Sequence, residues 1–173
     1  MQFTAAVGLS VVSTIVSAIV AVYAHRRSVP GSRGVAAFST ATALWAGGNA
    51  VQVAVTDLAT KLLAINVQYV GILVVPLAWF VFAAEYTGRE SWVTPRTVGA
   101  LAVFPVVLFV AVITNEWHLL VRTDVGLETV DGVVRLTREF GPLFWVATAY
   151  SWLVSSVGTM LLLDHAIRVG SEY

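Results

Sequence analysis

The side chains of this sequence that could do chemistry are few and scattered. The three histidines, His25, His118 and His165, lie far apart and lack the spacing of a metal-ligand set. There is no cysteine to act as a nucleophile or a thiolate ligand. No glycine-rich phosphate loop, nucleophile elbow or pair of catalytic carboxylates occurs in the sequence. The sequence therefore predicts neither catalysis nor a resident metal ion or cofactor.

A second group of polar side chains interrupts segments that are otherwise apolar. Asn49 and Gln52 lie three residues apart on one helical face, and Gln68 precedes Tyr69 in the next apolar segment. Amides removed from water need hydrogen-bond partners, so we expect these groups to face the interior of a helix bundle. Two roles stay open. The amides could bond helices together, or they could line a ligand cavity for which Trp45 supplies an apolar wall.

Two acidic residues mark the ends of apolar segments. Glu85 closes one segment beside Tyr86 and is predicted to pair with an arginine at the membrane surface, the alternative being a proton or signal switch. Asp164 and His165 follow the last apolar segment, where a single histidine is predicted to be a surface group. A proton relay is not indicated, because a relay needs a chain of titratable groups inside the membrane.

The elements that must position these groups are membrane-spanning helices. Of the 173 residues, 58% are hydrophobic and 12% are charged, which is about half the charged fraction of soluble domains. The formal net charge of zero leaves no basic surface for nucleic acid. This composition excludes a soluble enzyme, a nucleic-acid-binding domain and a disordered tail, and it makes the lipid bilayer the first partner of the chain.

Five apolar segments without Asp, Glu, Lys or Arg are long enough to cross a bilayer as helices. They predict one all-α, polytopic membrane bundle over residues 1–173, with helices at about 3–24, 35–55, 62–84, 98–114 and 142–163. The first segment has no basic residue ahead of it and is too long for a cleaved signal peptide, so we expect it to be retained. Within the long connection 115–141, Asp131-Gly132 between β-branched runs predicts a short β-hairpin.

The basic residues predict the orientation of this multi-pass protein in the cell membrane. One side of the predicted bundle carries six arginines, namely Arg26, Arg27, Arg33, Arg89, Arg96 and Arg168. The other side carries Lys61, Arg122, Arg135 and Arg138. Because short cytoplasmic connections are enriched in Lys and Arg, we expect the N-terminus and the connection 115–141 outside and the C-terminus in the cytoplasm.

This orientation places several of the candidate residues at the outer end of the bundle. Trp117 and His118 leave the fourth helix there, and Trp145 enters the fifth, at the level of Gln52 and the Gln68-Tyr69 pair. Aromatic and amide groups beneath an external loop predict a small-molecule pocket. The alternative is a packed aromatic plug that anchors the loop.

An ordered set of landmarks carries a family resemblance. The set comprises Leu44-Trp45, Gln68-Tyr69-Val70-Gly71, Pro76, Trp79, Glu85-Tyr86-Thr87-Gly88-Arg89, Thr114-Asn115-Glu116-Trp117-His118-Leu119-Leu120, Phe140-Gly141-Pro142-Leu143-Phe144-Trp145 and Tyr150. In this order the landmarks cover nearly the whole chain, which resembles the amino-terminal seven-transmembrane sensor region of membrane histidine kinases. The resemblance implies a signal-input module, in which an external or membrane-borne cue shifts helix packing and a cytoplasmic kinase reads the shift.

The sequence departs from that family at its end. Family sensors continue with two more helices and kinase modules, whereas this sequence stops at Tyr173. We therefore expect a fragment of a longer sensor or a stand-alone relative whose output lies in a partner. The alternative function is a non-catalytic accessory subunit of a larger membrane complex. A transporter is not favoured, because intramembrane charges and internal repeats are missing.

A bundle of only these five helices would leave interhelical faces uncovered. We therefore expect a homo-oligomer or a membrane partner protein. The sequence does not identify the ligand or cue.

Overall fold

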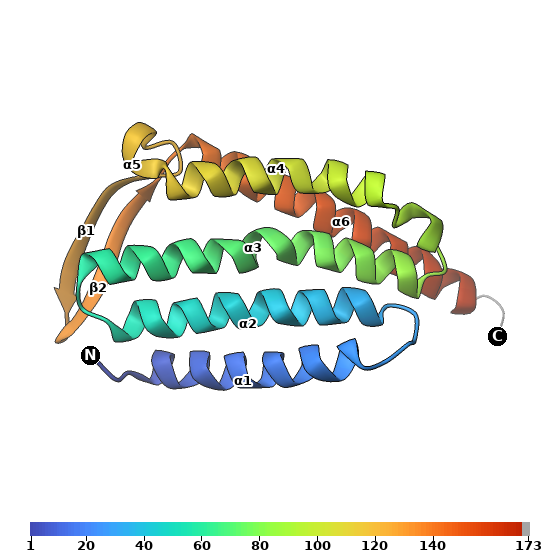
Figure 1. Cartoon of the computed structure of the whole chain (residues 1–173), viewed down its shortest axis with the longest axis horizontal. Coiled ribbons are helices and arrows are strands. Elements are labelled where there is room, and N and C mark those ends of the chain that lie inside the picture. Colours follow the sequence, from blue (N-terminus) through green and yellow to red (C-terminus); the bar gives the residue numbers. More distant parts are fainter. Residues whose placement is uncertain (171–173) are drawn as a thin grey trace.

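The computed structural model describes residues 1–170, and five long helices lie side by side within them (Figure 1). They are α1 (Ala5–His25), α2 (Ser32–Ala54), α3 (Leu58–Tyr86), α4 (Pro95–Ile113) and α6 (Pro142–Gly170). The short helices η1 (Glu90–Trp92) and α5 (Asn115–His118) flank α4, and the strands β1 (Arg122–Val130) and β2 (Val133–Phe140) precede α6. The predicted helical membrane bundle with a hairpin is confirmed.

The helix α3 is the centre of the bundle. It contacts α2 on one side and α4 and α6 on the other, whereas α1 packs against α2. In the most apolar 18-residue stretch of each helix, 50% of α3 is buried, against 6% of α1 and 17% of both α4 and α6. The apolar surfaces of the outer helices therefore face the surroundings, as expected for helices in contact with lipid.

Of the helices in residues 1–170, α1, α3, α4 and α6 are long and apolar enough to cross a membrane. The fifth, α2, has a similar length of 23 residues but contains several Gly, Ser and Thr residues besides Asn49 and Gln52. It lies between α1 and α3 (Figure 1), so these two helices cover part of its more polar surface.

Three helices begin at a capping side chain that accepts a hydrogen bond from the first turn of the helix. Thr4, Asp57 and Thr94 each accept a hydrogen bond from the backbone N–H three residues further on. The bond from the Thr60 N–H, at 2.8 Å, also holds the pKa of the Asp57 carboxyl below its usual range. Asp57 is therefore the N-cap of α3.

The helices extend beyond the apolar segments from which they were predicted. The third begins at Leu58 instead of residue 62, and the last continues to Gly170 instead of residue 163. Hydropathy marks only the part of a helix that can lie in lipid. Backbone hydrogen bonding continues into the aqueous region until a cap or a turn ends it.

The hairpin closes one end of the bundle. Strands β1 and β2 pair antiparallel, and the turn residues Asp131 and Gly132 have φ angles of 51° and 75°, the left-handed conformation of a type I′ turn. Gln2 ties this hairpin to the start of the chain, since its Nε2 donates to the backbone oxygen of Val134 and its Oε1 accepts from the N–H of that residue, both at 2.9 Å. The same Nε2 donates to the oxygen of Val53 at 2.7 Å.

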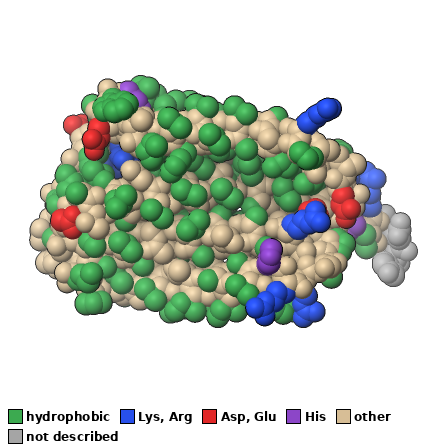
Figure 2. Space-filling model, in the orientation of Figure 1, with side chains coloured by type: hydrophobic (Ala, Val, Ile, Leu, Met, Phe, Trp, Pro, Cys, Tyr) green, Lys and Arg blue, Asp and Glu red, His purple; other side chains and the backbone are tan. Residues whose placement is uncertain are grey.

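The bundle thus has two distinct ends. The hairpin end contains the N-terminus, the α2–α3 connection, α5 and the hairpin (Figure 1). The arginine end contains the α1–α2 connection, the segment between α3 and α4, and the last turns of α6. Figure 2 shows green hydrophobic side chains along the length of the bundle, whereas most blue Lys and Arg side chains on this face gather at the arginine end.

Candidate functional site

A buried polar cluster at the hairpin end joins the hairpin to the helices. Asn115 is 3% exposed, and its Oδ1 accepts hydrogen bonds from the N–H groups of Val121 and Arg122, at 3.0 and 3.1 Å. Its Nδ2 donates to the backbone oxygen of Arg122 at 2.9 Å. One amide side chain therefore holds the start of β1 against the helical turn that follows α4.

The side chain of Arg122 connects the hairpin to the central helix. Arg122 is 5% exposed, and its Nη2 donates to Oδ1 of Asn66 on α3 at 2.9 Å. Its Nη1 is also buried but has no hydrogen-bond partner among the described residues. Burial lowers the pKa of the Arg122 guanidinium, although an arginine stays protonated in proteins. A buried cationic donor without an acceptor is costly, so an acceptor brought to Nη1 would be strongly stabilising.

Lys61 provides a second buried cation at this end. It is fully buried in the first turn of α3, and its Nζ donates to the backbone oxygen of Gln52 at 2.8 Å. The carbonyl groups in the last turn of a helix lack partners within the helix. Lys61 therefore satisfies one such group of α2 and closes the corner between α2 and α3.

Two of the predicted amides lie between helices. Asn49 donates to the hydroxyl of Ser10 on α1 at 2.9 Å, so it bonds α1 to α2. Gln68 is 8% exposed, and its Nε2 is buried without a partner among the described residues. It packs so closely on α2 that a Cβ added to Gly48 would lie 2.6 Å from its Cγ. Over residues 1–170, Gln68 is thus the one side-chain amide whose nitrogen is fully buried without a hydrogen-bond partner.

The structure does not bring the eight candidate residues into one pocket. Tyr69, next to Gln68, lies in a buried apolar cluster, and Gln52 is half-buried with its backbone oxygen bonded to Lys61. The tryptophans Trp45, Trp117 and Trp145 are instead 47%, 86% and 61% exposed. A role for these residues in ligand binding stays a prediction.

His118 has a structural place in the turn after α4. Its Nδ1 accepts a hydrogen bond from the N–H of Leu120 at 3.0 Å, and its Nε2 lies 3.3 Å from the hydroxyl of Thr114. Nothing in residues 1–170 forms a cluster of three or more His, Cys, Asp or Glu side chains that could hold a metal ion.

Contacts of α6 with the end of α3 and the turn after it organise the arginine end. Arg89 forms an ion pair with Asp164, which also accepts from Nε of Arg168 at 3.0 Å. The ring of Tyr86 meets the ring of His165 edge-on, with centroids 5.9 Å apart. The predicted surface histidine therefore takes part in a contact between helices.

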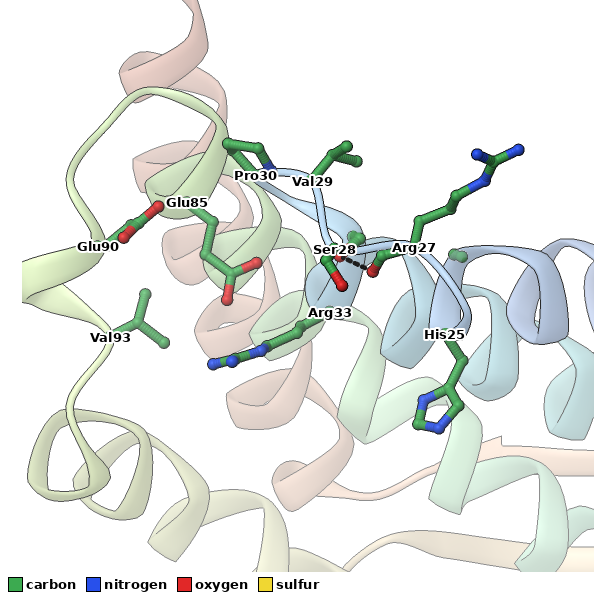
Figure 3. A pocket seen from close by; sticks show the side chains of 11 residues that line it. His25, Arg27, Ser28, Val29, Pro30, Arg33, Glu85, Glu90 and Val93 are labelled. Atoms are coloured by element: carbon green, nitrogen blue, oxygen red, sulfur yellow. Dashed lines mark hydrogen bonds between the residues drawn. The ribbon is translucent and has the colours of Figure 1, made fainter.

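The predicted pairing of Glu85 with an arginine is wrong for the described part of the chain. Glu85 is 8% exposed, and its carboxylate forms no ion pair or hydrogen bond there, because the adjacent Arg89 pairs with Asp164. Glu85 instead lines a cavity of about 510 Å³ at the arginine end (Figure 3).

Comparison with known proteins gives one family. A family model described as the N-terminal 7TM region of histidine kinase matches residues 9–173 of the chain. No curated protein and no solved structure matches it.

Proposed function

The chain belongs to the family of the N-terminal seven-transmembrane region of histidine kinases, and on this premise we propose that it receives a cue at the hairpin end and passes it to a cytoplasmic output. This family is the sensor region of such kinases and not their catalytic part. The observation that carries the proposal is the hydrogen bond between Arg122 of the hairpin and Asn66 of α3. Through it, a change in the hairpin acts directly on the central helix.

The input step uses the incomplete hydrogen bonding of Arg122. Its Nη1 has no acceptor within residues 1–170, while its Nη2 donates to Asn66. A cue that offers Nη1 an acceptor, or that displaces the hairpin, changes the balance between a hydrogen bond at Nη1 and the existing bond from Nη2 to Asn66. The position of α3 relative to the hairpin shifts with that balance, because a charge-assisted hydrogen bond is among the stronger contacts in a protein.

The packing around α3 supports transmission along the bundle. A Cβ added to Gly71 would lie 2.3 Å from the backbone oxygen of Ala41, so α2 and α3 touch backbone to backbone. On the other side, the ring of Trp79 lies against Gly158 of α6 and donates from Nε1 to the hydroxyl of Thr159 at 3.2 Å. Closely packed elements move between discrete arrangements and do not deform continuously, so a shift of α3 repositions its neighbours.

The output step runs through α6. This helix is joined to the end of α3 by the Tyr86–His165 ring contact and to the turn after α3 by the Arg89–Asp164 ion pair. Both contacts lie at the arginine end, where the predicted orientation places the cytoplasm. A movement of α3 therefore reaches α6 at the level where a kinase would read it.

The orientation on which this proposal depends can be tested with single cysteines, because the chain has none of its own. Thr129 on the hairpin and Ser28 at the arginine end are both exposed. We expect a membrane-impermeant maleimide to label Thr129→Cys on intact cells and to label Ser28→Cys only after lysis. The reverse pattern would invert the topology, and labelling of both on intact cells would contradict the helix count.

The function itself is tested in a histidine kinase that carries this region, reconstituted in liposomes. We expect Arg122→Gln and Gln68→Ala each to change autophosphorylation by about fivefold, the size of a typical coupling between two sites. Arg135→Gln is the matched control, because Arg135 is an exposed arginine on β2, and it should leave autophosphorylation unchanged. If both test variants stay folded and behave like the control, the hairpin end is not the input, and an accessory role is favoured.

A further inference from the structure

We propose that the arginine end binds one membrane phospholipid with an ethanolamine headgroup, whose phosphate and amine occupy the cavity beside Glu85 and whose acyl chain follows a groove along α2. This proposal does not depend on signalling. It is carried by two adjoining cavities with different linings and by the Glu85 carboxylate, which opens on the first cavity and has no partner within residues 1–170.

The first cavity has a volume of about 510 Å³ and is lined by the end of α1, the start of α2, the end of α3 and η1. Figure 3 shows Glu85 and Arg33 extending into the same space, with Glu90 and Val93 at its side. Arg33 and Glu85 thus bring one cation and one anion to this space, whereas the Arg27 guanidinium extends away from it and donates to the hydroxyl of Tyr23 at 2.6 Å. Such a lining complements a zwitterion better than a simple anion or cation.

Glu85 supplies the evidence for a ligand donor. It is 8% exposed, yet its carboxylate accepts no hydrogen bond from the described residues. Its carboxylate oxygens are not among the buried unpaired atoms of residues 1–170 and open on the cavity, where a cation or several N–H groups would compensate the negative charge. The ammonium of an ethanolamine headgroup offers both, whereas a choline headgroup has no N–H to donate.

The second cavity supplies a place for an acyl chain. It has a volume of about 460 Å³ and shares His25 and Arg33 with the first cavity. The rest of its lining is small or apolar and consists of Ala36, Ala37, Thr40, Ala41 and Leu44 of α2 and Val74 of α3. From Ala36 to Leu44 a helix rises about 12 Å. The groove therefore runs from the arginine end towards the middle of the apolar span.

Three parts of the two cavities lie in the same order as the chemical groups of a phospholipid. The apolar groove leads to His25 and Arg33, and beyond them lie Glu85 and Glu90. A phospholipid has its phosphate between the acyl chains and the amine. Arg33 suits the phosphate because a guanidinium binds phosphate oxygens through paired N–H groups. The cavity also lies where the apolar parts of α1 and α3 end, which is the level of lipid headgroups.

The test titrates the full chain in detergent with phosphatidylethanolamine, phosphatidylcholine and phosphatidylglycerol of identical acyl chains and follows binding by native mass spectrometry. We expect the ethanolamine lipid to bind about tenfold more tightly than the choline lipid, the value of one charge-assisted hydrogen bond. Glu85→Gln should abolish this preference. Glycerophosphoethanolamine, which has no acyl chains, should bind far more weakly than the lipid.

A pair of matched substitutions tests the groove. Ala37→Phe fills it, whereas Ala100→Phe adds the same ring to an exposed position on α4. We expect Ala37→Phe to weaken binding of the ethanolamine lipid by about tenfold and Ala100→Phe to leave it unchanged, with thermal unfolding confirming that both variants are folded. Equal binding of the three lipids, a preference that survives in Glu85→Gln, tight binding of the soluble headgroup or equal behaviour of the two phenylalanine variants would each overturn the proposal.

Discussion

Replacing Gly71 by alanine is expected to lower the free energy of unfolding by about 2–3 kcal/mol, the cost of forcing an extra group into a packed interface. The added Cβ would lie 2.3 Å from the backbone oxygen of Ala41 and 2.8 Å from the backbone nitrogen of Trp45. Both atoms belong to the backbone of α2, so no side-chain rotation relieves the contact. The substitution can be accommodated only if α2 and α3 move apart, which also loosens their other contacts.

The matched control is the same substitution at Gly99 on α4. No atom lies within 4 Å of a Cβ added there, and alanine is the better helix former, so stability should rise by about 0.5–1 kcal/mol. Unfolding in mixed detergent micelles measures both variants under one condition. Equal stability of Gly71→Ala and Gly99→Ala would show that α2 and α3 are not in backbone contact.

The close approach at Gly71 illustrates what the sequence could and could not predict. Five apolar segments located the long helices, and Asp131-Gly132 predicted the hairpin turn. These features are local, because a span or a tight turn depends on residues near each other in the chain. The contact of Gly71 with Ala41 joins two helices at a particular register, and hydropathy contains no information about register.

The buried charges were missed for a related reason. Lys61 and Arg122 were counted as loop charges that orient the bundle, because a hydropathy profile places every charge in water. The structure buries Lys61 through a bond to the end of α2 and Arg122 through a bond to Asn66, a residue 56 positions away in the sequence. Similarly, the partner of Arg89 is Asp164, 75 positions away, and not the nearby Glu85.

The candidate site was predicted only in part. Gln68 and Tyr69 are buried as expected, whereas Trp117 and Trp145 are largely exposed. In water an aromatic residue usually marks the core, but a helix in lipid can present aromatic residues outward at little cost. The tryptophans near the helix ends suit the headgroup region equally well. Residue type alone therefore could not distinguish a pocket wall from a membrane-facing anchor.

Replacing Asn115 by alanine is expected to lower the free energy of unfolding of the hairpin end by about 3 kcal/mol, because three buried backbone groups lose their partner. The backbone amides of Val121 and Arg122 should lose protection from hydrogen exchange. Asn115→Asp keeps the oxygen that accepts from both amides, but it places a second carboxylate oxygen where Nδ2 donates to the Arg122 carbonyl. Two acceptors then face each other at a buried site, so its cost should be at least as large, about 3 kcal/mol.

Hydrogen–deuterium exchange measured by mass spectrometry distinguishes a local effect from a global one. Glu116→Ala is the control, because Glu116 is the exposed neighbour of Asn115 in the same short helix. If Asn115 holds the hairpin to the bundle, exchange in Asn115→Ala should rise in β1 and β2 and stay unchanged in the middle of α3. A rise throughout α3 and α4 would mean that Asn115 supports the bundle as a whole. The hairpin would then not be an element that a cue can move independently.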